Sequence, residues 1–362
     1  MTQEPRVLVI GAGPCGLLSA LLLARFGVPC MIVDGKDGPS IHPRAMGITR
    51  RTAELYRQLG LLEQMREMDI QEEGLALSIC MRSLAGEEFG RTAMGELNSE
   101  YTPCRAFHCP QPHTEKVLLE ALEKEPLARV CYGTRVTNLT EVPGDGVRAH
   151  LETGGKKSTL RVPWVIAADG AGGGTRHQLG IESAGSGDMG QFLNIYFVAD
   201  YASRLTNSRA VLYHCVSTDY AEFFVSVNGG SQWLMHHFLM PGETQEDYPD
   251  EKLVEIIRRA SGFEDIKPRI ISVNKWVMSP KVSQGFRHGR IFLTGDAAAR
   301  LSPSGGLGMN TGLQAAHNLA WKLAAVIQGT AEEALLDTYE TERRPLALQR
   351  MHATNKNSIE VF

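Results

Sequence analysis

The sequence has little excess charge of either sign. Its 37 Lys and Arg residues stand against 41 Asp and Glu residues, so the net charge is −4 over 362 residues. No run of five or more like charges occurs. Proteins that bind nucleic acids or anionic membranes usually carry a basic stripe. The charge balance therefore gives no support to a partner of either class.

Cysteine is also scarce, and its number is odd. The seven cysteines are scattered along a chain that is long enough to fold without disulfide staples. We therefore expect reduced thiols and a cytoplasmic setting. Cys104 and Cys109 have four residues between them, a spacing that is seen in some redox disulfides. No spacing of cysteine, histidine or carboxylate residues indicates a metal site.

A long uninterrupted apolar stretch is absent. The most apolar segment, residues 7–33, is broken by four glycines and two prolines, and no basic cluster or cleavage site frames it. Internal repeats, low-complexity tracts and flexible linkers are absent as well. We expect a soluble protein of about two domains, since a domain contains about 150 residues.

Two secondary-structure patterns alternate along the chain. Short apolar runs and Leu/Ala-rich segments predict parallel strands and helices at both ends of the sequence. Between residues 191 and 276, β-branched and aromatic segments with Gly, Asn and Ser breaks predict an antiparallel sheet. The fold is therefore expected to be α/β with an inserted antiparallel layer. Buried strands are expected at 6–10, 30–34, 161–168 and 290–294, other strands at 130–137, 148–153, 193–198, 210–216, 222–227 and 232–239, a turn at 143–146, helices at 17–26, 52–62, 114–124 and 311–327, and a mostly helical segment from 331 that Pro345 breaks.

The first motif that carries chemistry is a glycine pattern between a predicted strand and a predicted helix. Gly11 permits the tight turn, Gly13 lets the backbone approach a pyrophosphate, and Gly16 lets the helix pack on the strand. The N-terminus of the helix that follows the glycines then faces the phosphates. Asp34, at the end of the second strand, is placed to bind a ribose diol. The pattern predicts dinucleotide binding, and a purely structural turn is the alternative.

Two further motifs follow predicted strands. Asp169-Gly170 ends an apolar strand, and by itself it fits a plain turn as well as a binding site. Gly295-Asp296 ends another strand and leads into a glycine-rich loop before a helix. Asp296 can accept hydrogen bonds from polyol hydroxyls, and the backbone N–H groups from Gly308 through Met309 to Asn310 suit an anion.

With these motifs the sequence resembles the class A flavoprotein monooxygenases, the family of para-hydroxybenzoate, phenol and polyketide hydroxylases. The resemblance covers about residues 6–346. It rests on the glycine pattern, Asp169-Gly170, Gly295-Asp296 and three further segments. These segments are His42-Pro-Arg44-Ala45, Pro110-Gln111 with Glu115, and residues 336–345.

The resemblance implies a Rossmann-like βαβ FAD-binding domain and a set of cofactor contacts. It places Arg44 at the FAD pyrophosphate, Gln111 at the flavin nucleotide and Pro303 in the loop beside the flavin. NADPH or NADH binds transiently, because no second dinucleotide fingerprint occurs, and O₂ is the second co-substrate. The expected FAD-binding residues are Gly11, Gly13, Pro14, Gly16, Asp34, Arg44, Gln111, Asp169, Gly295, Asp296, Pro303, Gly308, Met309 and Asn310.

The resemblance also implies hydroxylation of a phenolic or polyketide-type aromatic substrate through a flavin C4a-hydroperoxide. Phenols react faster as phenolates, so a base or polar relay from the antiparallel sheet is useful. The candidates are Tyr213, His236 and His237, although each is also compatible with a core or surface role. His236 and His237 point to opposite faces of a strand, so at most one of them faces a given pocket.

The motif positions divide the chain discontinuously. We expect an FAD-binding domain at 1–70, 105–185 and 285–345, a substrate domain at 71–104 and 186–284, and a C-terminal helical segment at 346–362 that belongs to a compact or a truncated member. Ala299 and Ala315 replace a His and an Asp that many relatives carry.

Several alternatives stay open beside hydroxylation. One is a Baeyer–Villiger or epoxidising oxygenase of the same family, and another is a flavin-binding protein without turnover. A disulfide reductase using Cys104 and Cys109 lacks its second dinucleotide fold, and a halogenase lacks its Trp-x-Trp-x-Ile-Pro segment. The substrate, the preferred nicotinamide and the oligomeric state are not given by the sequence.

Overall fold

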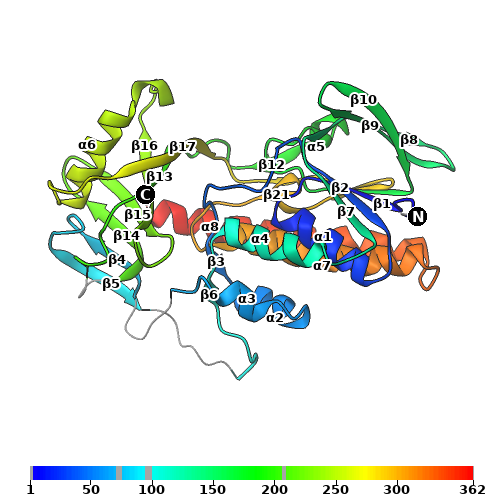
Figure 1. Ribbon diagram of the computed structural model, residues 1–362, viewed down its shortest axis with the longest axis horizontal. Coiled ribbons are helices and arrows are strands. Elements are labelled where there is room, and N and C mark those ends of the chain that lie inside the picture. Colours follow the sequence, from blue (N-terminus) through cyan, green and yellow to red (C-terminus); the bar gives the residue numbers. More distant parts are fainter. Residues whose placement is uncertain (1–2, 71–75, 94–99, 206–208, 362) are drawn as a thin grey trace.

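The computed structural model describes residues 3–70, 76–93, 100–205 and 209–361 of the chain. It contains one body built on a mainly parallel sheet and a second body built on a mainly antiparallel sheet (Figure 1). This arrangement confirms the expected fold class, an α/β fold with an antiparallel layer inserted into it.

The first body is centred on a six-stranded sheet whose strands are short, and most of them are buried apolar runs. Across the sheet they follow as β19 (Arg287–His288), β20 (Ile291–Leu293), β11 (Trp164–Ala167), β1 (Val7–Ile10), β2 (Cys30–Val33) and β7 (Ala128–Cys131). All neighbours pair in parallel except the edge strand β19, which runs antiparallel to β20.

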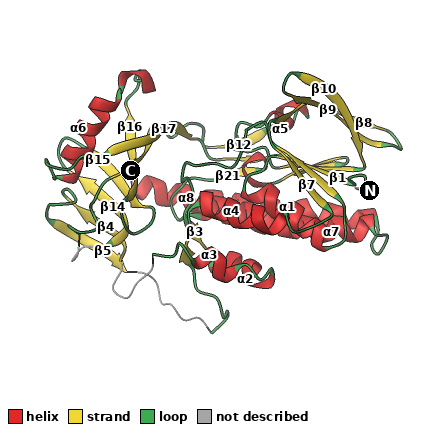
Figure 2. Ribbon diagram, in the orientation of Figure 1, coloured by secondary structure: helices red, strands yellow, loops and turns green. Residues whose placement is uncertain are grey.

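This sheet is covered on both faces, as a parallel sheet requires. Val7 and Val9 of β1 pack toward helices α1 (Pro14–Arg25), α4 (Gln111–Leu122) and α7 (Leu307–Ile327). Leu8 and Ile10 pack toward a three-stranded antiparallel sheet of β8 (Thr134–Val142), β9 (Gly146–Thr153) and β10 (Lys156–Val162). Figure 2 shows the helices and this small sheet on opposite sides of the parallel sheet.

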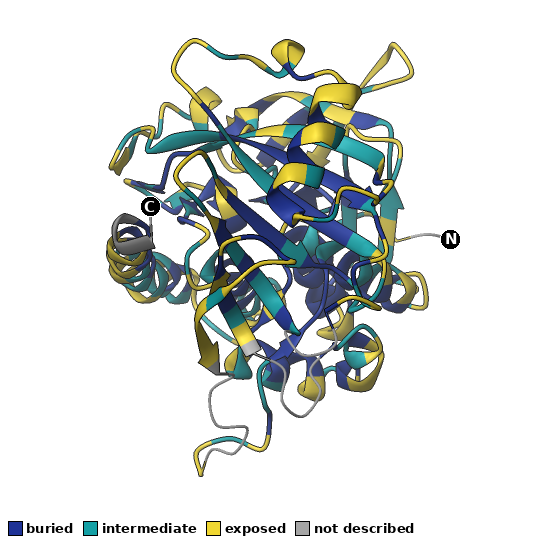
Figure 3. Ribbon diagram, turned by 90° about the vertical axis from the view of Figure 1, so that its left-hand side faces the viewer, coloured by how far each residue is buried: buried dark blue, intermediate teal, exposed yellow. Residues whose placement is uncertain are grey.

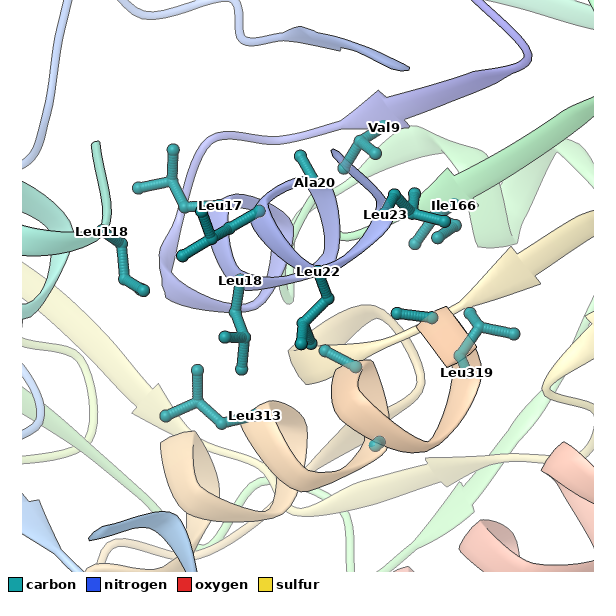
Figure 4. Packing of buried hydrophobic residues seen from close by; sticks show 14 of the residues in the cluster. Val9, Leu17, Leu18, Ala20, Leu22, Leu23, Leu118, Ile166, Leu313 and Leu319 are labelled. Atoms are coloured by element: carbon teal, nitrogen blue, oxygen red, sulfur yellow. The ribbon is translucent and has the colours of Figure 1, made fainter. Parts of the chain in front are cut away.

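Helix α1 is buried along almost its whole length. In Figure 4, Leu18 and Leu22 of α1 point toward Leu313 and Leu319 of α7, whereas Ala20 and Leu23 on the other side of α1 lie next to the strand residues Val9 and Ile166. A helix that is apolar all round must be covered on all sides. The sandwich of α1 between the sheet and α7 meets that requirement and holds the start of α1 next to the start of α7.

The second body is a seven-stranded sheet, in which only β14 and β4 pair in parallel. One face buries an apolar core under helix α6 (Asp250–Ser261), and Figure 3 shows the buried strands from that side. The order across the sheet is β17 (Arg269–Met278), β13 (Gly190–Val198), β16 (Gln232–Leu239), β15 (Ala221–Ser226), β14 (Ala210–Val216), β4 (Ala76–Met81) and β5 (Glu88–Ala93).

Short elements connect the two bodies or complete their edges. The strands are β3 (Gly47–Ile48) with β6 (Phe107–His108), and β12 (Ser183–Gly185) with β18 (Lys281–Ser283) and β21 (Ala299–Arg300). The remaining α-helices are α2 (Arg50–Gln58), α3 (Leu62–Arg66), α5 (Gly174–Gln178) and α8 (Asp337–Val361), and the 3-10 helices are η1 (Gln245–Asp247), η2 (Gly295–Ala297) and η3 (Glu333–Leu336).

Several expected boundaries were wrong, and among the helices α1 begins at Pro14 rather than at 17 and α2 ends at Gln58 rather than at 62. The strand expected at 130–137 is two strands in different sheets, because Gly133 turns the chain at φ +64° between β7 and β8. The strand expected at 161–168 is divided at Pro163 into the ends of β10 and β11. Helix α7 begins at Leu307 rather than at 311, and Pro345 lies inside α8 without ending it.

Two expectations about composition can be compared with the structure. Within the described part of the chain, no helix is both long enough and apolar enough to cross a membrane. All seven cysteines are free thiols, and Cys104 and Cys109 are both buried. The sulfur of Cys109 lies 3.2 Å from Thr114 Oγ1, and burial raises the pKa of this thiol to about 12.

Candidate functional site

The glycine loop after β1 contains two glycines that are required for packing and one that faces open space. A Cβ atom on Gly11, whose φ is +98°, would lie 2.4 Å from the carbonyl oxygen of Ala168. A Cβ atom on Gly16 would lie 1.9 Å from the carbonyl oxygen of Gly11. Gly13 has no such neighbour within 4 Å, so its backbone is open to a ligand. Pro14 begins helix α1 directly after it.

Asp34 lies at the end of β2, beside this loop. Its Oδ2 accepts a hydrogen bond from the backbone N–H of Ala12 (2.8 Å), and its Oδ1 accepts one from the backbone N–H of Lys36 (2.9 Å). The carboxylate is therefore held against the glycine loop, where a ribose would follow a pyrophosphate.

A second set of groups comes from residues 40–45 and the start of α4. Glu115 accepts hydrogen bonds from Gln111 Nε2 (2.7 Å) and from the backbone N–H of Ser40 (2.8 Å). The backbone N–H of Gln111 donates to the carbonyl of Ala45 (2.8 Å). These bonds fix the segment that carries Arg44, whose side chain is exposed.

Asp296 lies where three chain segments converge. A Cβ atom on Gly312 would lie 2.5 Å from the sulfur of Cys15 and 2.9 Å from Cα of Gly295, so the starts of α1, η2 and α7 are in close contact. Asp296 is exposed, although the surrounding protein desolvates it enough to raise its pKa, and the charges of Arg300 and Arg44 oppose that shift. An exposed carboxylate beside two arginines suits a polar ligand.

The glycine-rich loop before α7 also presents free backbone donors. Gly305 and Gly306 have φ values of +100° and +64°, and α7 starts at Leu307. The N–H groups of Leu307, Gly308 and Met309 have no acceptor within the helix. A Cβ atom on Gly308 would meet nothing within 4 Å. The helix dipole adds positive potential at this point.

Two further cofactor residues expected from the sequence, besides Asp34 and Gln111, also form side-chain hydrogen bonds within the protein. The side chain of Asn310 donates to the carbonyls of Gly47 (2.7 Å) and Gly306 (2.8 Å) and accepts from the N–H of Thr49 (2.9 Å). Asp169 Oδ2 accepts a hydrogen bond from the N–H of Thr175 (3.0 Å), while its buried Oδ1 has no partner in the described part of the chain. Both side chains stabilise the backbone around the loops, which favours a turn role for the Asp169 motif.

Pro303 is exposed and is flanked by two serines that contact α8. Ser358 Oγ hydrogen-bonds to Ser302 Oγ and lies 2.7 Å from Ser304 Oγ. Helix α8 therefore anchors the loop on both sides of Pro303.

The two faces of the seven-stranded sheet separate the three catalytic candidates. His237 hydrogen-bonds to Glu222 Oε1 (2.7 Å) and packs against Tyr248, on the side covered by α6. Tyr213 lies on the same side, and its hydroxyl accepts from the N–H of Ala210 (2.8 Å). His236 points to the opposite face, where its Nδ1 donates to Asn194 Oδ1 (2.5 Å).

The face that carries His236 is turned toward the first body. His42, which follows β2, forms a 2.8 Å hydrogen bond through Nδ1 with Ser272 Oγ of β17 and packs edge-on against Tyr196 of β13. Met46 packs against Tyr196 and Leu234. Burial lowers the pKa of His42 and of His236 to about 4, and each shift is increased by a neighbouring positive charge, that of Arg44 for His42 and that of His42 for His236.

His42 is a site residue that the sequence pattern did not assign. Its Nε2 is buried without a hydrogen-bond partner among the described residues. The His-Pro-Arg-Ala segment was the available signal, but only Arg44 received a role from it.

A row of ring side chains crosses the same face, next to His236. Five adjacent strands, from β17 to β14, each contribute one ring, and neighbouring ring centroids lie 4.2–6.3 Å apart. The members are Trp276, Phe192, Phe238, Phe223 and His214. Aromatic rings at such spacing pack well against another flat aromatic molecule.

The residues present fit FAD. Backbone N–H groups at two helix starts, next to glycines that face open space, suit a pyrophosphate and an anionic ring, and carboxylates at Asp34 and Asp296 suit diols.

Comparison with known proteins agrees with this fit. A family model described as an FAD binding domain matches residues 4–354. Tetracenomycin A2 monooxygenase-dioxygenase of Streptomyces glaucescens is 33% identical, over 95% of this chain and 66% of that protein. 4-Methyl-5-nitrocatechol 5-monooxygenase of Burkholderia sp is 36% identical, over 95% of this chain and 64% of that protein.

Solved structures of FAD complexes are also similar to this chain. Aklavinone-11 hydroxylase in complex with FAD and aklavinone has a TM-score of 0.90 and 30% identity, with 99% of this chain and 70% of that chain covered. The flavin-dependent monooxygenase PieE, in complex with FAD and substrate, has a TM-score of 0.92 and 28% identity, with 99% and 64% covered. The chain spans slightly under two thirds of the length of the two curated relatives described above.

Proposed function

The chain belongs to the FAD-binding-domain family of flavoprotein monooxygenases, and from that premise we propose that it is an NAD(P)H-consuming monooxygenase that hydroxylates a phenolic or polyketide-type aromatic compound. The observation that carries the proposal is the sheet face turned toward the first body. That face combines a neutral, half-buried His236 with the adjacent row of aromatic rings.

The proposed cofactor site is the set of open backbone positions and carboxylates between α1 and α7. Gly13 and the N–H groups at the start of α7 hold the anionic parts of FAD, while Asp34 and Asp296 accept hydrogen bonds from its hydroxyls. Bound FAD supplies hydride acceptance from the nicotinamide and activation of O₂. Arg44, Gln111 and Pro303, which were assigned in the sequence, complete this proposed set, while the side chains of Asp169 and Asn310 hold the backbone around it.

The substrate is proposed to lie on the His236 face. Because Nδ1 of His236 donates to Asn194, a neutral imidazole leaves Nε2 as an acceptor for a phenol hydroxyl. With a pKa near 4, His236 is a weak base, so its contribution is to orient the hydroxyl rather than to remove its proton. The aromatic row packs against the flat part of the substrate and excludes water.

The proposed domain division follows the two sheets. The FAD-binding domain comprises 1–70, 105–185 and 285–345, and the substrate domain comprises 71–104 and 186–284. In support, β4 and β5 join strands from residues 190–278 in one sheet. Residues 1–2 of the FAD-binding domain, residues 71–75, 94–99 and 206–208 of the substrate domain, and Phe362 of the C-terminal helical segment at 346–362 lie outside the described residues.

The test is oxidation of NADPH and NADH under O₂ by the purified chain loaded with FAD, with a panel of phenols, quinones and polyketides. A hydroxylated product with matched nicotinamide consumption supports the proposal. A ring-expanded product would instead favour a Baeyer–Villiger reaction, which the sequence left open. Peroxide without any product across the panel, or failure to bind FAD, would reject it.

A further inference from the structure

Two chain segments form a narrow ribbon at the junction of the two bodies (Figure 1). The ribbon consists of residues 40–48, which contain β3, and residues 107–111, which begin with β6. The segments pair antiparallel through β3 and β6, and the backbone N–H groups of Cys109 and Gln111 donate to carbonyls of the first segment (2.7 and 2.8 Å). We call this unit the junction ribbon. Because the pairing runs along it, its two segments are held in one register.

The junction ribbon contributes to the proposed FAD site at three points. It carries Arg44 and Gln111, which belong to the proposed set of cofactor residues. It is also bonded to the start of α7, where Asn310 Nδ2 donates to the carbonyl of Gly47 (2.7 Å). The position of the ribbon therefore determines where two proposed FAD contacts lie relative to the backbone donors of α7.

Two buried histidines bind the same ribbon to the antiparallel sheet of the second body. His42 and His108 are 3% and 2% exposed. Nδ1 of His42 lies 2.8 Å from Oγ of Ser272 on β17, and Nε2 of His108 donates to the carbonyl of Val227, which follows β15 (2.9 Å). His42 also packs edge-on against Tyr196, with ring centroids 6.0 Å apart. Hydrogen bonds that are shielded from water are costly to break, so these contacts constrain the ribbon.

Ser272 belongs to the sheet face that carries His236. Tyr196 of β13 pairs with Ser272, and Asn194, two residues away on the same strand, pairs with His236. Alternate residues of a strand share a face and lie about 7 Å apart. His42 therefore contacts the sheet about 7 Å, along the strands, from the row that holds His236. The ribbon thus joins the proposed FAD contacts to the face on which the substrate is proposed to lie.

We propose that the junction ribbon lets the substrate sheet control FAD affinity, and that the hydrogen bond between His42 and Ser272 is the contact that transmits this control. The inference rests on the proposed function, because it takes Arg44 and the start of α7 as FAD contacts. While the bond holds, residues 40–45 are already in place for FAD. Without the bond, FAD must order this segment itself, and the cost of that ordering lowers its affinity. Linkage requires the effect to be mutual, so bound FAD must also stabilise β17 around Ser272.

Other hydrogen bonds also join the two bodies, so removal of this one should leave the fold intact. Arg300 Nε donates to the carbonyl of Ser279, directly after β17 (2.6 Å), and Ser302 Oγ donates to the sulfur of Met278 (3.4 Å). Ser272 is only partly buried, and alanine at that position only removes the hydroxyl. A change of FAD affinity in Ser272→Ala would therefore report the lost bond rather than a disrupted sheet.

The test is equilibrium titration of the purified FAD-free protein with FAD, followed by quenching of flavin fluorescence. Ser272→Ala should weaken FAD binding about fivefold, at the lower end of typical couplings between sites. Ser272→Thr keeps a hydroxyl on a residue type that suits strands, so it should restore most of the affinity. Ser231→Ala, at an exposed serine directly before β16, is the matched control and should bind FAD like the parent chain.

A double-variant comparison separates transmission through this bond from a general loosening of the junction. His42→Asn should also weaken FAD binding. If His42 acts through Ser272, adding Ser272→Ala to His42→Asn should weaken FAD binding no further, because the two changes remove the same bond. Independent losses would multiply instead, and that result would overturn the proposal. If His42→Asn does not fold, the Ala and Thr variants at Ser272 decide it.

Hydrogen exchange tests the reverse direction and distinguishes this inference from the proposed function. FAD should slow exchange at residues 11–16 in the parent chain and in Ser272→Ala, but at residues 270–274 in the parent alone. Unchanged FAD affinity in Ser272→Ala, an equal loss in Ser272→Thr, or equal protection of residues 270–274 in both proteins would overturn this inference while the proposed function stands. If FAD protects neither region of the parent chain, the proposed function fails as well.

Discussion

Gly13 and Gly16 are only three residues apart, but the protein has room for an added methyl group at Gly13 and none at Gly16. A Cβ atom on Gly16 would lie 1.9 Å from the carbonyl oxygen of Gly11, and backbone on both sides must move to relieve the contact. A Cβ atom on Gly13 would meet no protein atom within 4 Å. Gly16→Ala therefore tests the packing of α1 on the loop, and Gly13→Ala tests the space that the ligand is proposed to fill.

The expected cost of each change follows from these contacts. Overpacking of this kind costs about 1–3 kcal/mol, and the rigid backbone acceptor places Gly16→Ala near 3 kcal/mol. Gly13 is the N-cap of α1, with an extended backbone at φ −78°, so alanine is tolerated there and costs about 1 kcal/mol or less. In a protein of this size each kcal/mol shifts the unfolding midpoint by about 2 °C. We expect a loss of about 6 °C for Gly16→Ala and at most about 2 °C for Gly13→Ala.

The change at Gly13 should cost little stability but should weaken FAD binding strongly. A methyl group there occupies the position from which the backbone approaches the pyrophosphate, so we expect FAD to bind about 100-fold more weakly, or about 2.7 kcal/mol. The assay is thermal unfolding of the FAD-free proteins together with equilibrium titration by quenching of flavin fluorescence. Full FAD affinity in Gly13→Ala would refute the proposed placement of the pyrophosphate. Equal midpoints for the two variants would refute the packing argument.

Three further predictions concern the ligand-facing side chains. Asp296→Ala should weaken FAD binding at least tenfold in the same titration, because it removes an acceptor for the polyol; unchanged affinity would exclude that role. His236→Asn should lower the fraction of nicotinamide consumption that yields hydroxylated product, whereas His237→Asn, which changes the α6 side of the sheet, should leave that fraction unchanged; equal effects would remove His236 from the substrate face. The pKa of His42 is about 4 in the folded protein and about 6.5 in the unfolded chain, so the unfolded state binds more protons between these two pH values. The unfolding midpoint should therefore fall as the pH drops from 6.5 to 4. His42→Asn should reduce this dependence of the midpoint on pH.

The sequence predicted the parts of the fold that depend on neighbouring residues. The strand, glycine turn and helix around residues 7–25 form a local unit, and the glycine spacing reports its geometry directly. A predicted strand boundary was wrong where a single residue directs the chain from one sheet into another. Gly133 directs residues 130–137 into two strands, and no alternation of side chains could show that β7 joins the parallel sheet while β8 leaves it.

At Pro345 the sequence predicted a break in the helix that the structure does not have. A proline removes one backbone donor and disfavours the helix before it, so a break was the expected outcome. In the folded protein Arg344 donates to the carbonyl of Ser283 (3.0 Å), and the buried residues Tyr339 and Ala347 pack in the core on either side of the proline. Tertiary packing of α8 therefore outweighs the local preference.

For the site, the sequence by itself determined that a dinucleotide is bound and that the two adjacent histidines point to opposite faces of a strand. Both follow from short-range rules, namely glycine spacing in a strand–turn–helix unit and the two-residue period of a strand. Which histidine faces the flavin-binding body was decided only by tertiary structure, because α6 covers the His237 face and His42 covers the His236 face from some 190 residues away in the chain.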